Sequence, residues 1–445
     1  MKIVKQIRDN NLFELLKGSF IALLFKGLGI IIGVVFTWFI AKEYGAVGVG
    51  IYISFWSILM VASVVAKLGF DTAIVKFIAG FSIKKQFSFI KVIYKKANLW
   101  VFLSSVVLGI FIILFSKQIS FLFFETSTYN NIIIIIGLLT IPLSLLSIHA
   151  ESLKALKKIT AFSIFQNGTI FMLAIIFIWG FCLYRNENID VVYSLGVAIL
   201  ILFPISVLVW KKYYKQIKNT EEKNQGSFPF TNKEILKISI PMLLGNSLFL
   251  LMNWTDTLML SAMGAERDVG IYNTAVKISA LSSSILVAIN SIAMPKYAEL
   301  IEQKNTFAFR KFVKQTTLLI FILTAPILLC IFLFPEYLLG LFGEDFIEGK
   351  TALILLAIGH FFSAISGSTI HLLNMSGSEK AAQNILLIST ILNIGLNLIL
   401  IPFYGILGAA IATTSTTILW NLIAVIYIYN KFGFLTYPIN LRGKK

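Results

Sequence analysis

The sequence predicts an all-α integral membrane protein with about 12 transmembrane helices, arranged as two homologous six-helix lobes around a central cavity. Of the 445 residues, 58% are hydrophobic and only 13% are charged, which is too little charge to cover the surface of a soluble protein of this length. Apolar runs long enough to cross a bilayer recur along the whole chain. No run shows the alternating pattern of a membrane barrel strand, so helices are the expected element.

The two halves of the chain repeat each other at a fixed offset of 220 residues. The motif Gly50-Ile51-Tyr52 returns as Gly270-Ile271-Tyr272, and Lys76 returns as Lys296. The same offset relates polar and apolar positions near the start of each half, namely Glu14, Leu16, Lys17 and Ser19 with Glu234, Leu236, Lys237 and Ser239. Two homologous apolar halves are a common construction of transporters, with the substrate path between the halves.

The first half divides into a surface segment and six spans. Residues 1–17 are expected to form a cytoplasmic amphipathic segment on the membrane surface, and residues 18–210 the N-terminal six-helix lobe. The first long apolar run has span length and lacks a small-residue cleavage site, which indicates a retained helix rather than a signal peptide. The spans of this lobe are expected at residues 18–41, 47–68, 97–115, 131–149, 161–183 and 191–210.

A polar, charged cytoplasmic linker over residues 211–233 precedes the second half, and this composition is typical of a mobile connection. The C-terminal six-helix lobe is expected over residues 234–430, followed by a basic cytoplasmic tail over residues 431–445. The spans of this lobe are expected at residues 235–262, 269–294, 316–339, 351–373, 381–401 and 406–429.

The basic residues predict the orientation in the membrane. With the N-terminus in the cytoplasm, 30 of the 38 Lys and Arg residues fall on the cytoplasmic side. An excess of Lys and Arg marks that side, so both termini are predicted to be cytoplasmic. The net charge of +17 is therefore a topology signal, and its spread over short segments at one membrane face argues against a nucleic-acid partner.

Ionisable side chains within the predicted spans form the candidate site. A charge at mid-bilayer costs at least roughly 2.5–3.5 kcal/mol, so it normally faces a protein interior or a wet cavity. Lys26 and Lys277 have no acidic residue within four positions, and we predict that both line a central hydrated cavity suited to an anionic substrate. Lys67 and Asp71 lie four residues apart, so an ion pair at the end of the second span is the alternative to a role in the cavity.

Uncharged and weakly basic residues extend this site. Asn246 is the repeat counterpart of Lys26, and the spacing of Asn246, Asn253 and Asp256 places them on one face of the seventh span. Asn273 shares a face of the eighth span with Lys277. Hydrogen bonding between helices is the alternative role for the asparagines.

Two histidines lie in the tenth span, His360 and His371, at a spacing that returns to nearly the same helical face. Histidine can carry protons near neutral pH, and a hydrogen-bonded packing role is the alternative.

Several kinds of chemistry lack their sequence signature. No glycine-rich phosphate-binding loop of an ATP-driven engine occurs, and no His, Cys, Asp or Glu cluster has metal-site spacing. The longest loops predicted outside the membrane, at 116–130 and 340–350, are too short to house a catalytic domain. We therefore expect neither an enzyme nor a cofactor.

Three stretches resemble the motifs of a known family. They are Lys67-Leu-Gly-Phe-Asp-Thr-Ala-Ile-Val-Lys76, then Ile238-Ser-Ile-Pro-Met-Leu-Leu244, and then Asp256-Thr-Leu-Met-Leu260 followed by Val269-Gly-Ile-Tyr272. With the length and the six-plus-six layout, they resemble Wzx-type O-antigen or capsule flippases of the multidrug/oligosaccharidyl-lipid/polysaccharide exporter superfamily. Lys76 stands where arginine is common in that family, and a lysine cannot grip a phosphate bidentately.

The resemblance implies a protein of the bacterial cytoplasmic (inner) membrane that acts in O-antigen, lipopolysaccharide or capsule biosynthesis. Such proteins flip polyprenyl-pyrophosphate-linked oligosaccharide repeat units from the cytoplasmic to the periplasmic or outer leaflet by alternating access. The partners implied are this lipid-linked oligosaccharide, membrane lipid, a polysaccharide polymerase and a chain-length regulator. The substrate-binding candidates are Lys26, Lys67, Lys76, Asn246, Asn253, Asn273 and Lys277. Coupling to an ion gradient is expected, with Asp71, Asp256, His360 and His371 as candidates.

Three other functions fit the sequence less well. A drug or cation antiporter of the same superfamily should carry acidic residues in its cavity, whereas the predicted spans here carry more basic than acidic residues. A lipid II flippase usually has additional C-terminal spans. A membrane-embedded polysaccharide polymerase or ligase would need a sizeable outside loop with catalytic residues.

Overall fold

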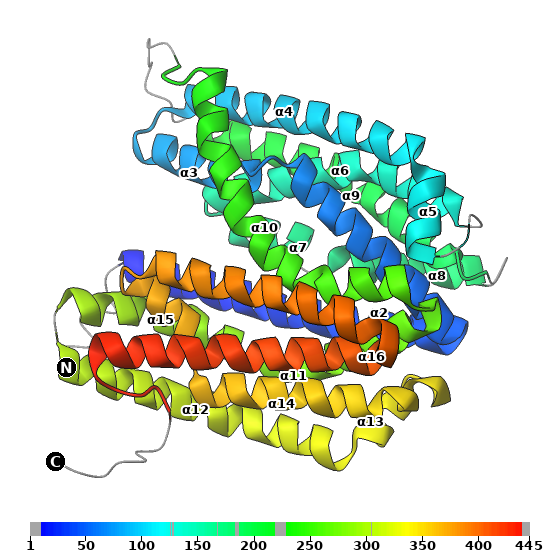
Figure 1. Cartoon of the computed structure of the whole chain (residues 1–445). Helices are drawn as coiled ribbons and strands as arrows, with labels where there is room; N and C mark the ends of the chain where they lie inside the picture. The colour runs from blue at the N-terminus through cyan, green and yellow to red at the C-terminus, as the bar shows by residue number, and fades with distance from the viewer. Residues whose placement is uncertain are drawn as a thin grey trace. The chain divides into compact units, whose positions relative to one another are not determined.

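Helices make up all of the regular structure in the computed structural model, within the residues that it describes (Figure 1). These residues are 10–124, 126, 129–166, 168–182, 187–218, 228–303 and 305–437. Their side chains are described except at 10–23, 83, 181–182, 217–218, 244–253, 291–292 and 295. The predicted all-α class is confirmed.

The helices follow one another along the chain with short connections. Those of the first half are α2 (Asn10–Ala66), α3 (Phe70–Ile83), α4 (Phe87–Leu114), α5 (Ser116–Phe124), α6 (Asn130–Ala155), α7 (Ile159–Gln166), α8 (Thr169–Cys182) and α9 (Asp190–Lys218). Those of the second half are α10 (Asn232–Met263), α11 (Glu266–Glu302), α12 (Thr306–Leu333), α13 (Pro335–Gly340), the 3₁₀ helix η1 (Glu344–Gly349), α14 (Lys350–Ser366), α15 (Thr369–Met375) and α16 (Glu379–Phe432).

Eight helices within the described residues are long and apolar enough to cross a membrane, or up to nine if the bent pair α7 and α8 forms one span. The protein is therefore a multi-pass membrane protein. α10, with 32 residues, is not among the eight, because its residues 244–253 fall outside the described side chains. The predicted number of 12 spans stays a prediction at this point.

Two of the eight helices are too long to be single spans. α2 has 57 residues and α16 has 54, so each is about 80–85 Å long at 1.5 Å per residue, against a hydrocarbon core of about 30 Å. Each contains a glycine outside the helical region, Gly45 at φ 65° and Gly405 at φ 51°. Glycine has no Cβ and adopts such angles at little cost, so α2 and α16 each consist of two helical segments joined at a glycine.

The chain divides into two compact units, and each is described by itself. Unit 1 holds residues 1–44 and 54–250, and unit 2 holds residues 45–53 and 251–445. The units follow the two halves of the sequence with two exceptions: segment 45–53 belongs to unit 2, and residues 234–250 of α10 belong to unit 1. The predicted lobe limits, 18–210 and 234–430, stay predictions.

In unit 1, α6 is the central helix and packs against α3, α4, α7 and α9. Its contact with α4 is close, because Gly109 of α4 lies against Gly137 of α6. A Cβ atom on Gly109 would lie 2.6 Å from the carbonyl oxygen of Gly137. Small residues at helix crossings let membrane helices approach in this way, and α6 is thereby held where it can present polar side chains to the site described below.

In unit 2, α11 packs against α12, α14 and α16. The segment 45–53 crosses the start of α11 through two glycines. A Cβ atom on Gly50 would collide with the carbonyl group of Glu266, and one on Gly270 would collide with the carbonyl oxygen of Ala46. Gly50 and Gly270 are repeat counterparts, so the duplicated Gly-Ile-Tyr motif forms both sides of one helix crossing.

Candidate functional site

The turn between α2 and α3 positions the first candidate residues. Leu68 has φ 50° and Gly69 has φ 75°, so two consecutive residues adopt the left-handed region that L-residues other than glycine rarely occupy. A Cβ atom on Gly69 would collide with the carbonyl oxygen of Ser239 and lie 2.6 Å from the backbone nitrogen of Leu243. Two of the three stretches that resemble family motifs, 67–76 and 238–244, therefore meet backbone to backbone at Gly69.

Across this turn, Lys67 and Asp71 form an ion pair. The distance from Lys67 Nζ to Asp71 Oδ2 is 3.2 Å, and the side chains are 12% and 18% exposed. Lys67 Nζ also donates to Ser147 Oγ of α6 at 3.4 Å, and Asp71 Oδ1 accepts from the backbone N–H of Thr72 at 2.8 Å. The ion pair expected from the four-residue spacing is confirmed, and α6 provides a further partner.

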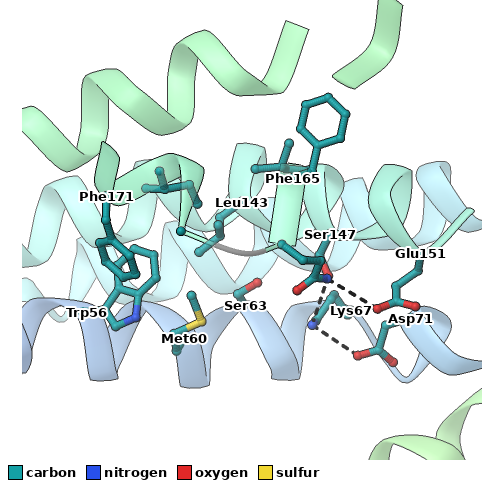
Figure 2. Close-up of a pocket in the computed structure, with 14 residues that line it drawn as sticks. Trp56, Met60, Ser63, Lys67, Asp71, Leu143, Ser147, Glu151, Phe165 and Phe171 are labelled. Carbon is teal, nitrogen blue, oxygen red and sulfur yellow. Dashed lines mark hydrogen bonds and ion pairs between the residues drawn. The ribbon is translucent and has the colours of Figure 1, made fainter. Parts of the chain in front are cut away.

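The pair lines a cavity of about 270 Å³ in unit 1, formed by α2, α6, α7, α8 and the turn before α3 (Figure 2). One side of the cavity is apolar and aromatic, with Trp56 and Phe171 at a ring distance of 5.0 Å and an interplanar angle of 55°. The other side carries polar and charged groups (Figure 2). The principal polar lining residues are Ser63, Lys67, Asp71, Ser147, Glu151 and Gln166.

Glu151 is the second carboxylate of this cavity, and its side chain is 15% exposed. Glu151 Oε2 accepts from Lys154 Nζ at 3.0 Å, and Oε1 accepts from Gln166 Nε2 at 3.4 Å. Glu151 is not among the residues that the sequence predicts for the site. A signal was present, because Glu151 is the only acidic residue in the basic connector 151–158.

A second hollow of about 390 Å³ adjoins the cavity, since Asp71 and Glu151 line both. Its remaining lining residues are Thr72, Val75, Lys76 and Lys154. Lys76, a predicted substrate-binding residue, is exposed there. Two adjoining hollows are thus lined by Lys67, Asp71 and Lys76, together with Glu151 and Lys154 from α6.

In unit 2, Asp256 is buried at 7% exposure and accepts hydrogen bonds from side chains of α11 and α16. Tyr272 of α11 donates its hydroxyl to Oδ2 at 3.0 Å, and Asn397 of α16 donates to Oδ1 at 2.6 Å. Thr413 of α16 donates to Oδ2. Asn397 also donates to Asn393 Oδ1 at 3.1 Å.

The hydrogen-bond partners that the described residues give Asp256 are all neutral side chains. Moving a charged carboxylate out of water is costly unless it is paired with a cation or neutralised. The buried carboxylate of Asp256 is therefore a candidate to bind a proton or a small cation.

Lys277 lies in unit 2, beside Tyr52, which is the repeat counterpart of Tyr272. Its Nζ donates to the hydroxyl of Tyr52 at 3.3 Å and lies 4.8 Å from the centre of that ring. Lys26 lies on α2 in unit 1 and is exposed. The prediction that both lysines line a central cavity stays a prediction.

The remaining candidates occupy different settings. Asn273 is buried, accepts from Thr257 Oγ1 at 3.0 Å and donates to the carbonyl of Val269 at 3.0 Å, which matches the helix-to-helix alternative. The common face expected for His360 and His371 assumed one continuous helix. The structure interrupts that helix at Gly367, which has φ 73°. The side chains of the last two candidates lie outside the described part of the chain, namely Asn246 and Asn253.

Comparison with known sequences identifies the family. The profile of the polysaccharide biosynthesis protein family matches residues 15–300, which is more than half of the chain, and the MatE profile matches residues 241–399. The chain is 27% identical over 224 residues to the capsular polysaccharide biosynthesis protein CapF of Staphylococcus aureus, which covers 49% of this chain and 54% of CapF. It is 28% identical over 165 residues to a "Probable low-salt glycan biosynthesis flippase" of Haloferax volcanii, covering 36% of this chain and 34% of that protein.

A further relative is an uncharacterized membrane protein of Methanocaldococcus jannaschii, 28% identical over 242 residues, with 54% of this chain and 57% of that protein covered. The alignments to these three relatives thus span between about a third and just over half of the relatives' own lengths.

Solved structures share the fold. The lipid II flippase MurJ in an inward closed conformation superposes with a TM-score of 0.70 at 16% identity, over 91% of this chain and 86% of MurJ. The MATE multidrug transporter DinF-BH superposes with a TM-score of 0.63 at 19% identity, over 95% and 96% of the two chains. At such identities the likeness concerns the fold alone. The chain belongs to the polysaccharide biosynthesis protein family, within the multidrug/oligosaccharidyl-lipid/polysaccharide exporter superfamily of membrane transporters.

Proposed function

We propose that this transporter flips polyprenyl-pyrophosphate-linked oligosaccharide repeat units from the cytoplasmic to the outer leaflet of a cell membrane, by alternating access of two lobes around a central cavity. The observation that carries the proposal is the charged cavity in unit 1. Residues of the family-like stretch 67–76 line it, inside a helical bundle of a membrane protein. Charged groups in such a bundle normally serve a hydrophilic ligand or an ion path.

The proposal includes 12 spans in two six-helix lobes. α2 and α16 each count as two spans because of the breaks at Gly45 and Gly405. α10 and the α7–α8 pair count as one span each, beside the six remaining candidate helices. The excess of Lys and Arg supports a cytoplasmic location for both termini, and the bacterial inner membrane is the proposed location. O-antigen or capsule synthesis is the proposed pathway, with a polysaccharide polymerase and a chain-length regulator as partners.

Transport is proposed to be driven by an ion gradient through Asp256. A buried carboxylate that receives hydrogen bonds from neutral groups changes its interactions when a proton or cation binds. Because Asp256 lies on α10 and its hydrogen-bond donors lie on α11 and α16, occupation of the site can alter how these three helices pack. Asp71, His360 and His371 remain further coupling candidates.

A second candidate function is supported by the same carboxylate. The MatE profile matches residues 241–399, which include Asp256, and a buried acidic group suits a cationic ligand. A drug or cation antiporter is therefore the alternative. A membrane-embedded polymerase or ligase is not proposed.

The deciding experiment is a lipid extract from cells that lack the protein. Accumulation of polyprenyl-pyrophosphate-linked oligosaccharide on the cytoplasmic side, with loss of surface polymer, is the expected result. Re-expression of the wild-type protein should reverse both effects. Unchanged carrier lipids together with increased sensitivity to cationic drugs would instead establish the antiporter.

A further inference from the structure

The unit 1 cavity differs from an anion site in its charge balance. Lys67 is paired with Asp71 at 3.2 Å, and Lys154 is paired with Glu151 at 3.0 Å. A doubly charged pyrophosphate inside the cavity would have to approach both carboxylates. The cation expected to grip a phosphate is already neutralised, so the ligand that this cavity favours carries no net negative charge.

The cavity has the two surfaces that a sugar ring needs. A pyranose has a face of C–H groups that packs on aromatic rings, and Trp56 and Phe171 supply such a surface in the shape of a corner. The pyranose also has hydroxyl groups around its edge that donate hydrogen bonds. Pockets that combine an apolar wall with a few well-placed polar groups are typical small-molecule sites.

Both carboxylates have acceptor capacity left for such hydroxyls. An ionised carboxylate offers about four lone-pair sites. Asp71 uses two of them for Lys67 and the N–H of Thr72, and Glu151 uses two for Lys154 and Gln166. Hydrogen bonds to charged acceptors are stronger than those between neutral groups, so a hydroxyl that reaches either carboxylate is held firmly.

The size of the cavity limits the ligand. A volume of about 270 Å³ equals that of about nine liquid waters at roughly 30 Å³ each, which is room for one sugar ring.

We propose that the cavity between Trp56 and the two carboxylates Asp71 and Glu151 is a subsite for a single neutral sugar ring of the cargo. This inference rests on the proposed function, and it adds which part of the cargo the cavity takes. Trp56 and Phe171 hold the face of the ring, and Asp71, Glu151 and Gln166 accept or donate hydrogen bonds at its edge.

The test uses the purified full-length protein in lipid nanodiscs. The probes are the methyl glycosides of glucose, galactose and N-acetylglucosamine, with methyl glucuronide and inorganic pyrophosphate as charged comparisons. At least one neutral glycoside is expected to raise the unfolding temperature in a saturable way, and the charged compounds are expected to give no shift at the same concentration. Absence of any saturable shift with all three neutral glycosides would overturn the subsite.

Variants locate the binding. Trp56→Leu and Glu151→Gln are each expected to weaken the glycoside by about tenfold, which corresponds to about 1.4 kcal/mol, whereas Trp56→Phe keeps an aromatic wall and should bind within about threefold of wild type. Trp179→Leu is the matched control, because Trp179 lies on α8 and is 63% exposed. The unfolding temperature measured without sugar shows whether each variant is folded. Equal loss in Trp179→Leu, or none in Trp56→Leu and Glu151→Gln, contradicts the assignment.

The two proposals can fail separately. Saturable glycoside binding that depends on Trp56, in a protein whose deletion leaves carrier lipids unchanged, supports the sugar subsite and refutes flipping. The opposite outcome is also possible to recognise. If carrier-linked oligosaccharide accumulates in the deletion strain, and if expression of Trp56→Leu or Glu151→Gln returns it to the normal level, flipping is supported and the subsite is refuted.

Discussion

The backbone carbonyl of Ser239 lies where a side chain on Gly69 would begin. This contact joins the start of α3 to α10, and it fixes the turn across which Lys67 and Asp71 meet at 3.2 Å. The cavity in unit 1 therefore depends on a backbone contact that involves none of its charged groups.

Replacing Gly69 by alanine should destabilise the protein and abolish export of the sugar polymer. The substitution places a Cβ at φ 75° and against the backbone of α10, and strain of this kind costs roughly 1–3 kcal/mol before the collision is added. Thermal unfolding of the purified protein measures the effect. Gly80→Ala is the control, since Gly80 lies in the same helix α3 with nothing within 4 Å of the new Cβ. It should be neutral or stabilising, because alanine favours a helix. Equal stability of both variants would contradict this account.

The partly buried pair of Lys67 and Asp71 should show coupling in a double-mutant cycle. Lys67→Met leaves Asp71 without its cation, and Asp71→Asn leaves Lys67 without its anion. The two single changes should therefore lower the free energy of unfolding by more in sum than the double change does. A coupling energy of roughly 0.5–3 kcal/mol is expected from contacting residues. Unfolding of the four proteins in the same detergent measures it. Additive effects would show that the pair contributes nothing beyond the individual side chains. The exposed pair of Lys296 and Glu299 is the comparison, expected at about 0–1 kcal/mol.

Asp256→Asn should stop transport while leaving the protein folded. Asparagine keeps the size of the side chain and one acceptor oxygen for Tyr272 and Thr413, but it cannot bind a proton or balance a cation. Surface polymer should fall by about tenfold or more, which corresponds to about 1.4 kcal/mol. The control is Asp345→Asn, since Asp345 is 57% exposed and pairs with Arg267, and surface pairs contribute about 0–1 kcal/mol. Normal polymer in Asp256→Asn would remove Asp256 from the coupling mechanism.

Lys277→Gln and Lys26→Gln test the predicted cationic cavity. Both variants should be expressed and folded, and both should reduce polymer export, because an anionic group of the cargo loses a cation. For Lys277, Tyr52→Phe separates the roles: it removes the hydroxyl 3.3 Å from Nζ and keeps the ring. If Lys277 acts on the cargo, Tyr52→Phe should have a smaller effect than Lys277→Gln. Lys296→Gln, at an exposed position, is the control. Wild-type export in both Lys26→Gln and Lys277→Gln would refute the cationic cavity.

The end of the linker is expected to anchor α10 to unit 1 through aromatic contacts. Phe230 lies 5.1 Å from Phe77 by ring centres, and its carbonyl accepts from Lys96 Nζ at 3.3 Å. Phe230→Ala should lower stability by roughly 1–3 kcal/mol, the value for one partly buried aromatic side chain. Thermal unfolding checks this, with Phe307→Ala as control because Phe307 is 78% exposed. A loss of the same size in the control would show that the anchor has no special role.

The sequence predicted those parts of the site that local spacing controls. Lys67 and Asp71 lie four residues apart, and this spacing gave an ion pair as one of two alternatives, which the structure confirms. It could not predict Glu151, which reaches the same cavity from α6, because no local pattern tells which helix packs beside which. His360 and His371 show the limit in the other direction, since the period of a helix holds only where the helix continues, and Gly367 ends it.

By itself the sequence determined the class of the protein, an all-α membrane protein, because hydropathy and helical period are local properties of the chain. The tertiary structure alone decided which residues meet. Asn397 reaches Asp256 across 141 positions, and Gly50 meets the start of α11 near its repeat counterpart Gly270. Such contacts follow from the packing of whole helices. A glycine allows close approach, and a buried carboxylate receives its hydrogen bonds, only when the neighbouring helices are in place.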